Sequence, residues 1–256
     1  MSTPPRNAKK YIILIGVLFL LPFVWIWIFS KTAIHHFNTL PYYGPDGVTV
    51  VLRDSTDDMS GIDDSVDHVI ISREGVTDDM AFYKLPEYSL TNHKGQAYGS
   101  DQLKGKTYLA MFISSESPFI NVAVKACAPV HFKYRGEEDI ELVFITNNPE
   151  QDTPKKLSAF INKVDKNEQY DFVSDKWQYL TGDSTTIAQL RADAFMIPSV
   201  EQSAVLWLVD ENGHLRGKYR PSWDFQYGTD QLKKAREDIA LLKKEMDVRR
   251  HESGND

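Results

Sequence analysis

The first candidate for chemistry is the segment of residues 114–122, which reads SSESPFINV and directly follows a short apolar run. Ser117 stands beside Glu116, and both are residue types that hydrolases use. Nucleophilic serine catalysis needs a general base that is oriented by a third group, and the sequence offers no such set. We therefore interpret Glu116 as a surface carboxylate, and we expect no catalytic residue and no enzyme activity here.

Thiol chemistry is limited by the cysteine count. Cys127 is the single cysteine of the chain, so neither an intrachain disulfide nor a dithiol redox pair can form. It follows Ser117 by ten residues, more than two turns into a predicted helix, which is too far for the two side chains to act together. We expect Cys127 to be a buried, small apolar residue.

The histidines and aspartates show no metal-site spacing. Only His35 and His36 form a pair, and adjacent helical residues point about 100° apart, so solvation at a membrane interface is the better interpretation. Residues 54–79 are rich in aspartate but lack the spacing of a calcium loop, which predicts a solvated acidic loop. A net charge of -7 argues against a nucleic-acid partner.

Residues 11–30 read YIILIGVLFLLPFVWIWIFS and carry no charge. At about 1.5 Å per residue such a helix is roughly 30 Å long, which suits one bilayer crossing. The run is too long for a signal peptide and does not end in small residues, and no cysteine follows it, so we expect an uncleaved anchor that is not a lipoprotein anchor. Arg6, Lys9 and Lys10 outnumber Lys31, which predicts a cytoplasmic N-terminus and an outward-facing, periplasmic remainder.

Elements alternate regularly from residue 85 onward. Turn signals predict hairpins at Lys94-Gly95 and at Asn212-Gly213. Continuous apolar runs predict buried strands, and helical spacing predicts amphipathic helices. The strands are expected at 108–113, 140–145 and 204–209, with shorter β-like runs at 48–52 and 68–72, and the helices after Pro118 (ended or kinked by Pro129), at 152–164, at 183–195 and at 229–246.

This order is typical of an α/β thioredoxin-like fold, in which chemistry sits where the first helix leaves its strand. Together with the N-terminal transmembrane helix it predicts five parts. They are a cytoplasmic N-terminus (1–10), the anchor (11–30), an extended tether with the acidic insertion (31–83), the thioredoxin-like domain (84–248) and a polar tail (249–256).

Five stretches in order carry a resemblance to a known family: LTNHKGQ, LKGKTYLAMFI, NNPEQDTPKKL, WQYLTGD and SAVLWLVDENGHLRGKY. From about residue 85 to 246 the sequence resembles the Sco/SenC family. The resemblance implies a membrane-tethered thioredoxin fold and a link to copper delivery and the assembly of cytochrome c oxidase, a respiratory oxidase.

The family's copper site uses two cysteines of a C-P-x-x-C motif and a distant histidine. The matching positions here are Ser117, Asn121 and Gln202, so the resemblance implies that all three ligands are replaced. Copper selects thiolate, thioether or imidazole donors, and a neutral hydroxyl with two amides supplies none of these. We therefore expect no metal and no cofactor at this position.

Three functions remain open on the sequence. The first is a Sco-like protein that has lost copper and thiol chemistry and acts as an interaction or scaffold component on a respiratory oxidase or its assembly machinery, with the membrane and membrane-complex subunits as partners. The second is a copper metallochaperone or redox protein with non-standard ligands. The third is a ligand-binding module at the former active site. The residues proposed for the second are Met59, Met80, His35 and His36, and those for the third are Phe119, Gln202 and Trp223.

Overall fold

The computed structural model describes Gly16 and residues 19–25, 39–45, 49–53, 68–72, 82–117, 120–168, 174–199, 205–220 and 225–253. The chain divides into two compact units, Met1–Phe37 and Asn38–Asp256. In the first unit, Gly16 and residues 19–25 are helical, and Phe19, Phe23 and Trp25 are exposed. A search of the described residues for a helix long and apolar enough to cross a bilayer finds none. The rest of the predicted anchor lies outside them.

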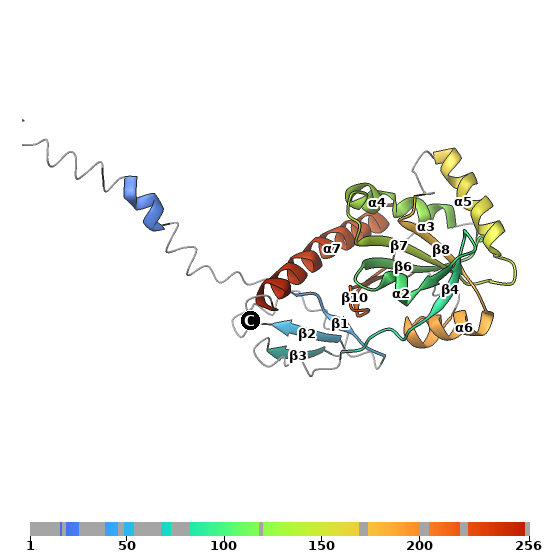
Figure 1. Cartoon of the computed structure of the whole chain (residues 1–256), viewed down its shortest axis with the longest axis horizontal. Helices are drawn as coiled ribbons and strands as arrows, with labels where there is room; N and C mark the ends of the chain where they lie inside the picture. The colour runs from blue at the N-terminus through green and yellow to red at the C-terminus, as the bar shows by residue number, and fades with distance from the viewer. Residues whose placement is uncertain are drawn as a thin grey trace, which may run out of the picture. The chain divides into compact units, whose positions relative to one another are not determined.

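The second unit is built on a seven-stranded sheet of order β10-β9-β6-β7-β8-β4-β5 (Figure 1). The central strands β6, β7 and β8 are parallel, and β4, β5, β9 and β10 join them in antiparallel pairs. Their bounds are β4 Ser89–Asn92, β5 Ala97–Gly99, β6 Thr107–Ile113, β7 Ile140–Thr146, β8 Trp177–Thr181, β9 Leu206–Val209 and β10 Leu215–Tyr219. The predicted α/β class and the predicted buried strands are confirmed.

Every residue of β6 is buried, because helices cover both faces of the sheet (Figure 1). Leu109, Met111 and Ile113 pack into one core with α3, α4, α5 and α7. Tyr108 and Phe112, on the other face, belong to a second core with α2, α6 and η2. The helices are α2 Ser100–Leu103, α3 Ile120–Ala126, α4 Ala128–Tyr134, α5 Pro154–Glu168, α6 Ser184–Gln189, the π-helix η2 Leu190–Ala194 and α7 Phe225–Ser253.

Local sequence signals explain several element ends. Gly95 and Gly213 have φ values of 79° and 87°, which a residue without a Cβ adopts at little cost, and both predicted hairpin turns are confirmed. Asp183 begins α6 by accepting the Thr186 N–H at 2.7 Å. Pro129 stands in the first turn of α4, where its missing N–H costs nothing, so it opens a second helix after α3 has ended.

A separate three-stranded sheet, of order β1-β2-β3, precedes this core. Its strands are β1 Tyr42–Tyr43, β2 Thr49–Arg53 and β3 His68–Ser72, and β2 and β3 are parallel. The short strands expected at 48–52 and 68–72 are thus confirmed. Because β2 and β3 are parallel, Arg53 and His68, which flank residues 54–67, lie at opposite ends of the strand pair. Residues 54–67 lie outside the described residues.

Residues 39–43 fall within the predicted tether, yet they pack on the folded domain. Arg216 of β10 is fully buried and donates to the carbonyl oxygens of Leu40 at 2.8 Å and Pro41 at 3.2 Å. Its guanidinium carbon lies 3.9 Å from the centre of the Tyr42 ring. The Leu40 N–H donates to Glu245 of α7 at 2.6 Å. The first described residues of this unit are therefore held by α7, its last helix.

The same arginine joins two buried carboxylates. Its Nη2 donates to Glu245 at 2.7 Å and its Nη1 to Asp210 at 3.2 Å. Burial acts to raise the pKa of Asp210, but the His214 hydrogen bond and the Arg216 charge outweigh it, and the pKa is lowered. Burial acts to lower the pKa of Arg216, and Glu245 reverses that effect. Such a group of charges is stable only when every member keeps its partner.

Candidate functional site

Residues 114–117, the described part of the segment SSESPFINV, lie at the carboxyl end of β6. A buried carboxylate holds them there. Asp152 has 0% of its surface exposed. It accepts the Ser115 N–H at 3.1 Å and the Thr146 hydroxyl at 2.6 Å, and it also accepts the Ser115 hydroxyl. The Ser117 N–H donates to the Ser114 carbonyl at 3.0 Å, which closes a turn.

The neighbouring end of β7 is tied into the same set of contacts. The Asn147 N–H donates to the Ile113 carbonyl at 2.6 Å, and the Asp152 N–H donates to the Asn148 carbonyl at 2.8 Å. The Asn148 N–H donates to the Thr146 hydroxyl at 2.9 Å. Parallel strands bring their carboxyl ends to the same edge of a sheet. At this edge the ends of β6 and β7 are hydrogen-bonded to each other and to the Asp152 side chain.

Glu116 carries the one other charge on this loop. Its carboxylate accepts from Lys156 Nζ at 3.1 Å, and the same Nζ lies 3.8 Å from Asp152 Oδ1. The Lys156 and Glu116 side chains are both more than 40% exposed, so this ion pair contributes little stability. Pairing with a lysine agrees with the interpretation of Glu116 as a surface carboxylate.

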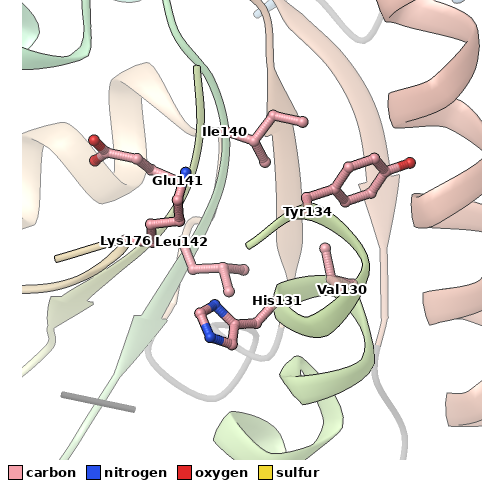
Figure 2. A pocket seen from close by; sticks show the side chains of 7 residues that line it. All are labelled: Val130, His131, Tyr134, Ile140, Glu141, Leu142 and Lys176. Atoms are coloured by element: carbon pink, nitrogen blue, oxygen red, sulfur yellow. The ribbon is translucent and has the colours of Figure 1, made fainter. Parts of the chain in front are cut away.

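A small cavity lies far from this loop, under α4 and at the start of β7. His131, Tyr134 and Leu142 are among its lining residues, and Figure 2 shows the Glu141 carboxylate and the Tyr134 hydroxyl pointing away from it. Its volume is about 10 Å³, which is at most the space of one water molecule. We interpret it as a packing void and not as a ligand site.

The family model described as SCO1/SenC matches residues 77–236, which is more than half of the chain. The chain belongs to the SCO1/SenC family. It is 28% identical over 102 residues to a SCO1 protein homolog from Bacillus subtilis (39% of this chain, 50% of the relative). It is 31% identical over 113 residues to a SCO2-like protein from Rickettsia felis (43% and 52%). The chain thus matches about half the length of these curated relatives.

A crystal structure of a SCO1/SenC family lipoprotein from Bacillus anthracis superposes with a TM-score of 0.50 at 23% identity, covering 63% of this chain and 95% of that protein. At this identity the superposition concerns the fold alone. With the observed strand order it confirms the predicted thioredoxin-like α/β fold.

The structure describes only some of the residues that the resemblance matches to the family's ligand positions. Ser117 is half-buried at the end of the loop, and Asn121 lies in the first turn of α3. Gln202 lies outside the described residues, as do Pro118 and Phe119, and nothing is described of the Asn121 side chain. The strand that follows Gln202 starts at Leu206, which pairs with Met111 near the same end of β6.

The donor atoms at these positions do not fit the copper that the SCO1/SenC resemblance implies. A serine hydroxyl is not ionised at neutral pH, and the amides of asparagine and glutamine are neutral oxygen and nitrogen groups. Cu(I) prefers thiolate and thioether donors, and Cu(II) prefers imidazole or thiolate. No step through copper can therefore be assigned to these residues.

Cys127 is not placed for thiol or metal chemistry. It is fully buried between α3 and α4, as predicted, and burial raises the pKa of its thiol to about 12. A thiol in this state is a poor nucleophile and a poor metal ligand, because both roles need the thiolate. Its contribution is to the packing of the core.

The residues considered for other chemistry are not brought together by the described part of the chain. His35, His36, Met59, Met80 and Trp223 lie outside the described residues. Among the residues that are described, no group of three or more His, Cys, Asp and Glu side chains converges as a metal site would require. Asp152, the carboxylate that joins Ser115 to Thr146, was not predicted as a site residue from the sequence. An aspartate two residues before Pro154 is typical of an ordinary helix start.

Proposed function

We propose that this protein is a membrane-anchored SCO1/SenC protein that has lost copper and thiol chemistry and serves as an interaction or scaffold component. Its partners would be subunits of a respiratory oxidase or of its assembly machinery, the setting that the family resemblance implies. In this proposal the protein is not an enzyme. The fold and the family are established above, and the role is the inference.

One observation carries the proposal. Ser117, Asn121 and Gln202 occupy the three positions that match the family's ligands, and their donors are the wrong kind for copper. The loop that bears Ser117 is nonetheless ordered by Asp152 through contacts with Ser115 and Thr146. A protein that keeps the fold without the family's metal ligands is most simply explained by a function that depends on the surface of that fold.

The anchor is part of the proposal. Residues 11–30 are uncharged and flanked by Arg6, Lys9 and Lys10 on one side and Lys31 on the other. This asymmetry supports a single-pass topology with a cytoplasmic N-terminus and a periplasmic domain. A scaffold in this position would meet membrane-complex subunits from the outer face of the membrane.

The test is a competition for Cu(I) between a chelator and the full-length protein purified in detergent. We expect the wild-type protein to leave the chelator loaded. The triple variant Ser117→Cys, Asn121→Cys, Gln202→His should remove about one equivalent of copper from it, because it restores two thiolates and an imidazole. The single variant Ser117→Cys is the matched control and should compete poorly.

Tight binding of one equivalent by the wild-type protein would refute the loss of copper chemistry. Alanine substitution of Met59, Met80, His35 and His36 would then decide whether the non-standard ligands of the metallochaperone alternative are responsible. The scaffold role has its own test, which is co-purification of oxidase or assembly-factor subunits after crosslinking in native membranes. Absence of such subunits would contradict that role.

A further inference from the structure

Two helices on one face of the sheet expose apolar side chains to solvent. Within the described residues of the second unit, the strongly exposed large apolar side chains are Val122 of α3, at 49%, and Phe132 of α4, at 44%. Pro129, between them, is exposed as well. The inner side of the same two helices belongs to the core through Val124, Cys127, Val130 and Tyr134. The helices are therefore apolar on both sides, whereas a surface helix is normally polar on its outer side.

The same helices carry positive charge and no acid. Residues 120–135 include Lys125, Lys133 and Arg135 but neither aspartate nor glutamate, in a chain whose net charge is -7. Lys133 and Arg135 are exposed. Lys133 donates to the backbone carbonyl of Arg236 at 3.5 Å, a neutral partner, so this contact does not offset its charge. Cations beside exposed apolar side chains are typical of surfaces that lie on anionic membranes.

The nearest acids in the sequence follow α4 and do not lie within it. Glu137 accepts from Lys243 of α7 at 2.6 Å, which offsets its charge, and Glu138 and Asp139 lead into β7. α3 and α4 both pack against α7 (Figure 1), where Arg236 and Lys243 contact the end of α4. These two cations and the three of residues 120–135 outnumber the three acids. The excess favours an anionic partner.

The point where the chain enters the domain lies near this surface. Eight residues, 31–38, separate the proposed anchor from the first described residue of the second unit, and they span at most about 30 Å. Leu40 binds Glu245 of α7, and Tyr134 of α4 donates to the Arg236 carbonyl at 2.7 Å. Glu245 and Arg236 are about 14 Å apart along the helix. The tether is longer than this separation, so the domain can turn α4 onto the bilayer.

We propose that the exposed side of α3 and α4 docks on the surface of an anionic phospholipid bilayer. Val122 and Phe132 enter the headgroup region, and Lys133 and Arg135 bind lipid phosphates, with Lys125 adding to the positive field. So small a patch binds a free vesicle weakly, but the tether makes docking an intramolecular step, for which a weak contact suffices. The inference rests on the anchor of the proposed function and not on the scaffold role.

The test uses the full-length protein reconstituted into vesicles of phosphatidylcholine alone or with about 30% phosphatidylglycerol. An environment-sensitive dye is attached at Pro129→Cys in a Cys127→Ala background, which keeps Val122 and Phe132 in place. Lipids that carry a nitroxide near the headgroup quench the dye only where it lies on the bilayer. The same dye at Asp101→Cys, an exposed position of α2 on the other face of the sheet, is the positional control.

We expect strong quenching at position 129 and little at position 101 when phosphatidylglycerol is present. Omission of that lipid should reduce the quenching, and so should a rise in salt from about 0.1 to 1 M, because the Debye length falls from about 10 to 3 Å. Lys133→Gln with Arg135→Gln should lower the ratio of docked to undocked protein by about 25-fold, about fivefold for each cation. Phe132→Ser should also lower it, through lost apolar burial.

Lys104→Gln removes an exposed cation at the end of α2 and is the matched charge control, which should change nothing. Circular dichroism in detergent establishes that each variant keeps the native fold. Alkaline washing of the vesicles is measured in parallel and reports on the anchor alone. Release of the protein by the wash would contradict the anchor and, with it, the docking that depends on it.

Retention of the protein with equal quenching at positions 129 and 101 would overturn the docking and leave the anchor intact. Quenching at position 129 that persists without the Lys133 and Arg135 charges would also overturn it, because the dye or the apolar side chains alone would then be responsible. An unquenched position 129 that instead crosslinks to an oxidase subunit in native membranes would show that this surface meets a protein and not lipid.

Discussion

Ser115 gives both its backbone N–H and its hydroxyl to one carboxylate, that of Asp152, which lies 37 residues further along the chain. Asp152 has no exposed surface and also accepts the Thr146 hydroxyl at 2.6 Å. One buried side chain thus connects the ends of β6 and β7. The family resemblance places the expected chemistry at this loop. In this protein the loop is ordered by hydrogen bonds between protein groups.

Asp152→Ala should therefore destabilise the protein by about 2–3 kcal/mol, because it leaves buried donors of Ser115 and Thr146 without an acceptor. Asp183→Ala is the matched control, an aspartate that begins α6 at the surface, and should cost about 1 kcal/mol. Urea unfolding followed by circular dichroism measures both. Equal losses for the two variants would mean that Asp152 is an ordinary helix cap.

Arg216→Ala should be more damaging, by about 3–5 kcal/mol, since it leaves Asp210 and Glu245 buried without their cation. The control is Lys233→Ala, which removes an exposed ion pair with Glu237 and should change the free energy of unfolding by less than about 0.5 kcal/mol. The same urea titration gives both values. A loss below about 1 kcal/mol for Arg216→Ala would show that the carboxylates find other partners.

His93 should make stability depend on pH. It is 7% exposed, and neither ring nitrogen has a hydrogen-bond partner. Burial, with the nearby Lys94 charge, lowers its pKa, and Asp175 opposes this weakly. Because the folded-state pKa lies below the unfolded value, the unfolded state binds more protons as pH falls. The stability from neutral His93 is complete above about pH 6.5 and is lost as pH falls through the lower folded-state pKa.

The variant His93→Phe isolates this effect, because it keeps the edge-on ring contact with Tyr179 at 5.7 Å and removes the titrating group. Wild type should lose more stability than the variant between pH 7.5 and pH 5.5, measured by urea unfolding at each pH. The other histidines contribute equally to both proteins and cancel in the difference. Parallel pH profiles for the two would contradict the prediction.

Cys127 should be silent towards thiol reagents in the native state. With its pKa raised to about 12 by burial, only on the order of 1 in 10,000 molecules carries a thiolate at pH 8. We expect labelling by a maleimide dye to be at least about 100-fold slower than in denaturant. Ser117→Cys in a Cys127→Ala background places a thiol at the half-buried loop and should label readily. Fast native labelling of wild type would refute the burial.

The apolar pattern of the sequence was sufficient to predict the central strands, because each of them is marked by its own continuous apolar run. The runs at 108–113 and 140–145 are apolar at nearly every position, as strands covered on both faces must be, and β6 and β7 agree with them to within one residue at either end. Gly95 and Gly213 marked their turns for the same reason, since the backbone there needs a positive φ.

Contacts between distant segments could not be predicted in this way. Arg216 sits in the run LRGKY, where a charged residue suggests an exposed position, and nothing local indicates that Glu245 lies opposite it. The same holds for Leu40, whose neighbours read as a tether because proline and glycine dominate them. At the candidate site, the family resemblance predicts the ligand replacement at Ser117 from the sequence alone. The role of Asp152, in contrast, depends on Thr146 and Ser115, which meet only after β6 and β7 pair.

The contact between Leu40 and Glu245 also bears on the order in which the domain is completed. It joins residues 205 positions apart, so it closes one of the longest loops that the chain can make, and contacts at such a separation slow folding. A chain that emerges N-terminus first holds Leu40 ready long before α7 exists. Until synthesis passes Glu245, Arg216 has only Asp210 of its two carboxylate partners, so this buried group of charges is incomplete until α7 has been made.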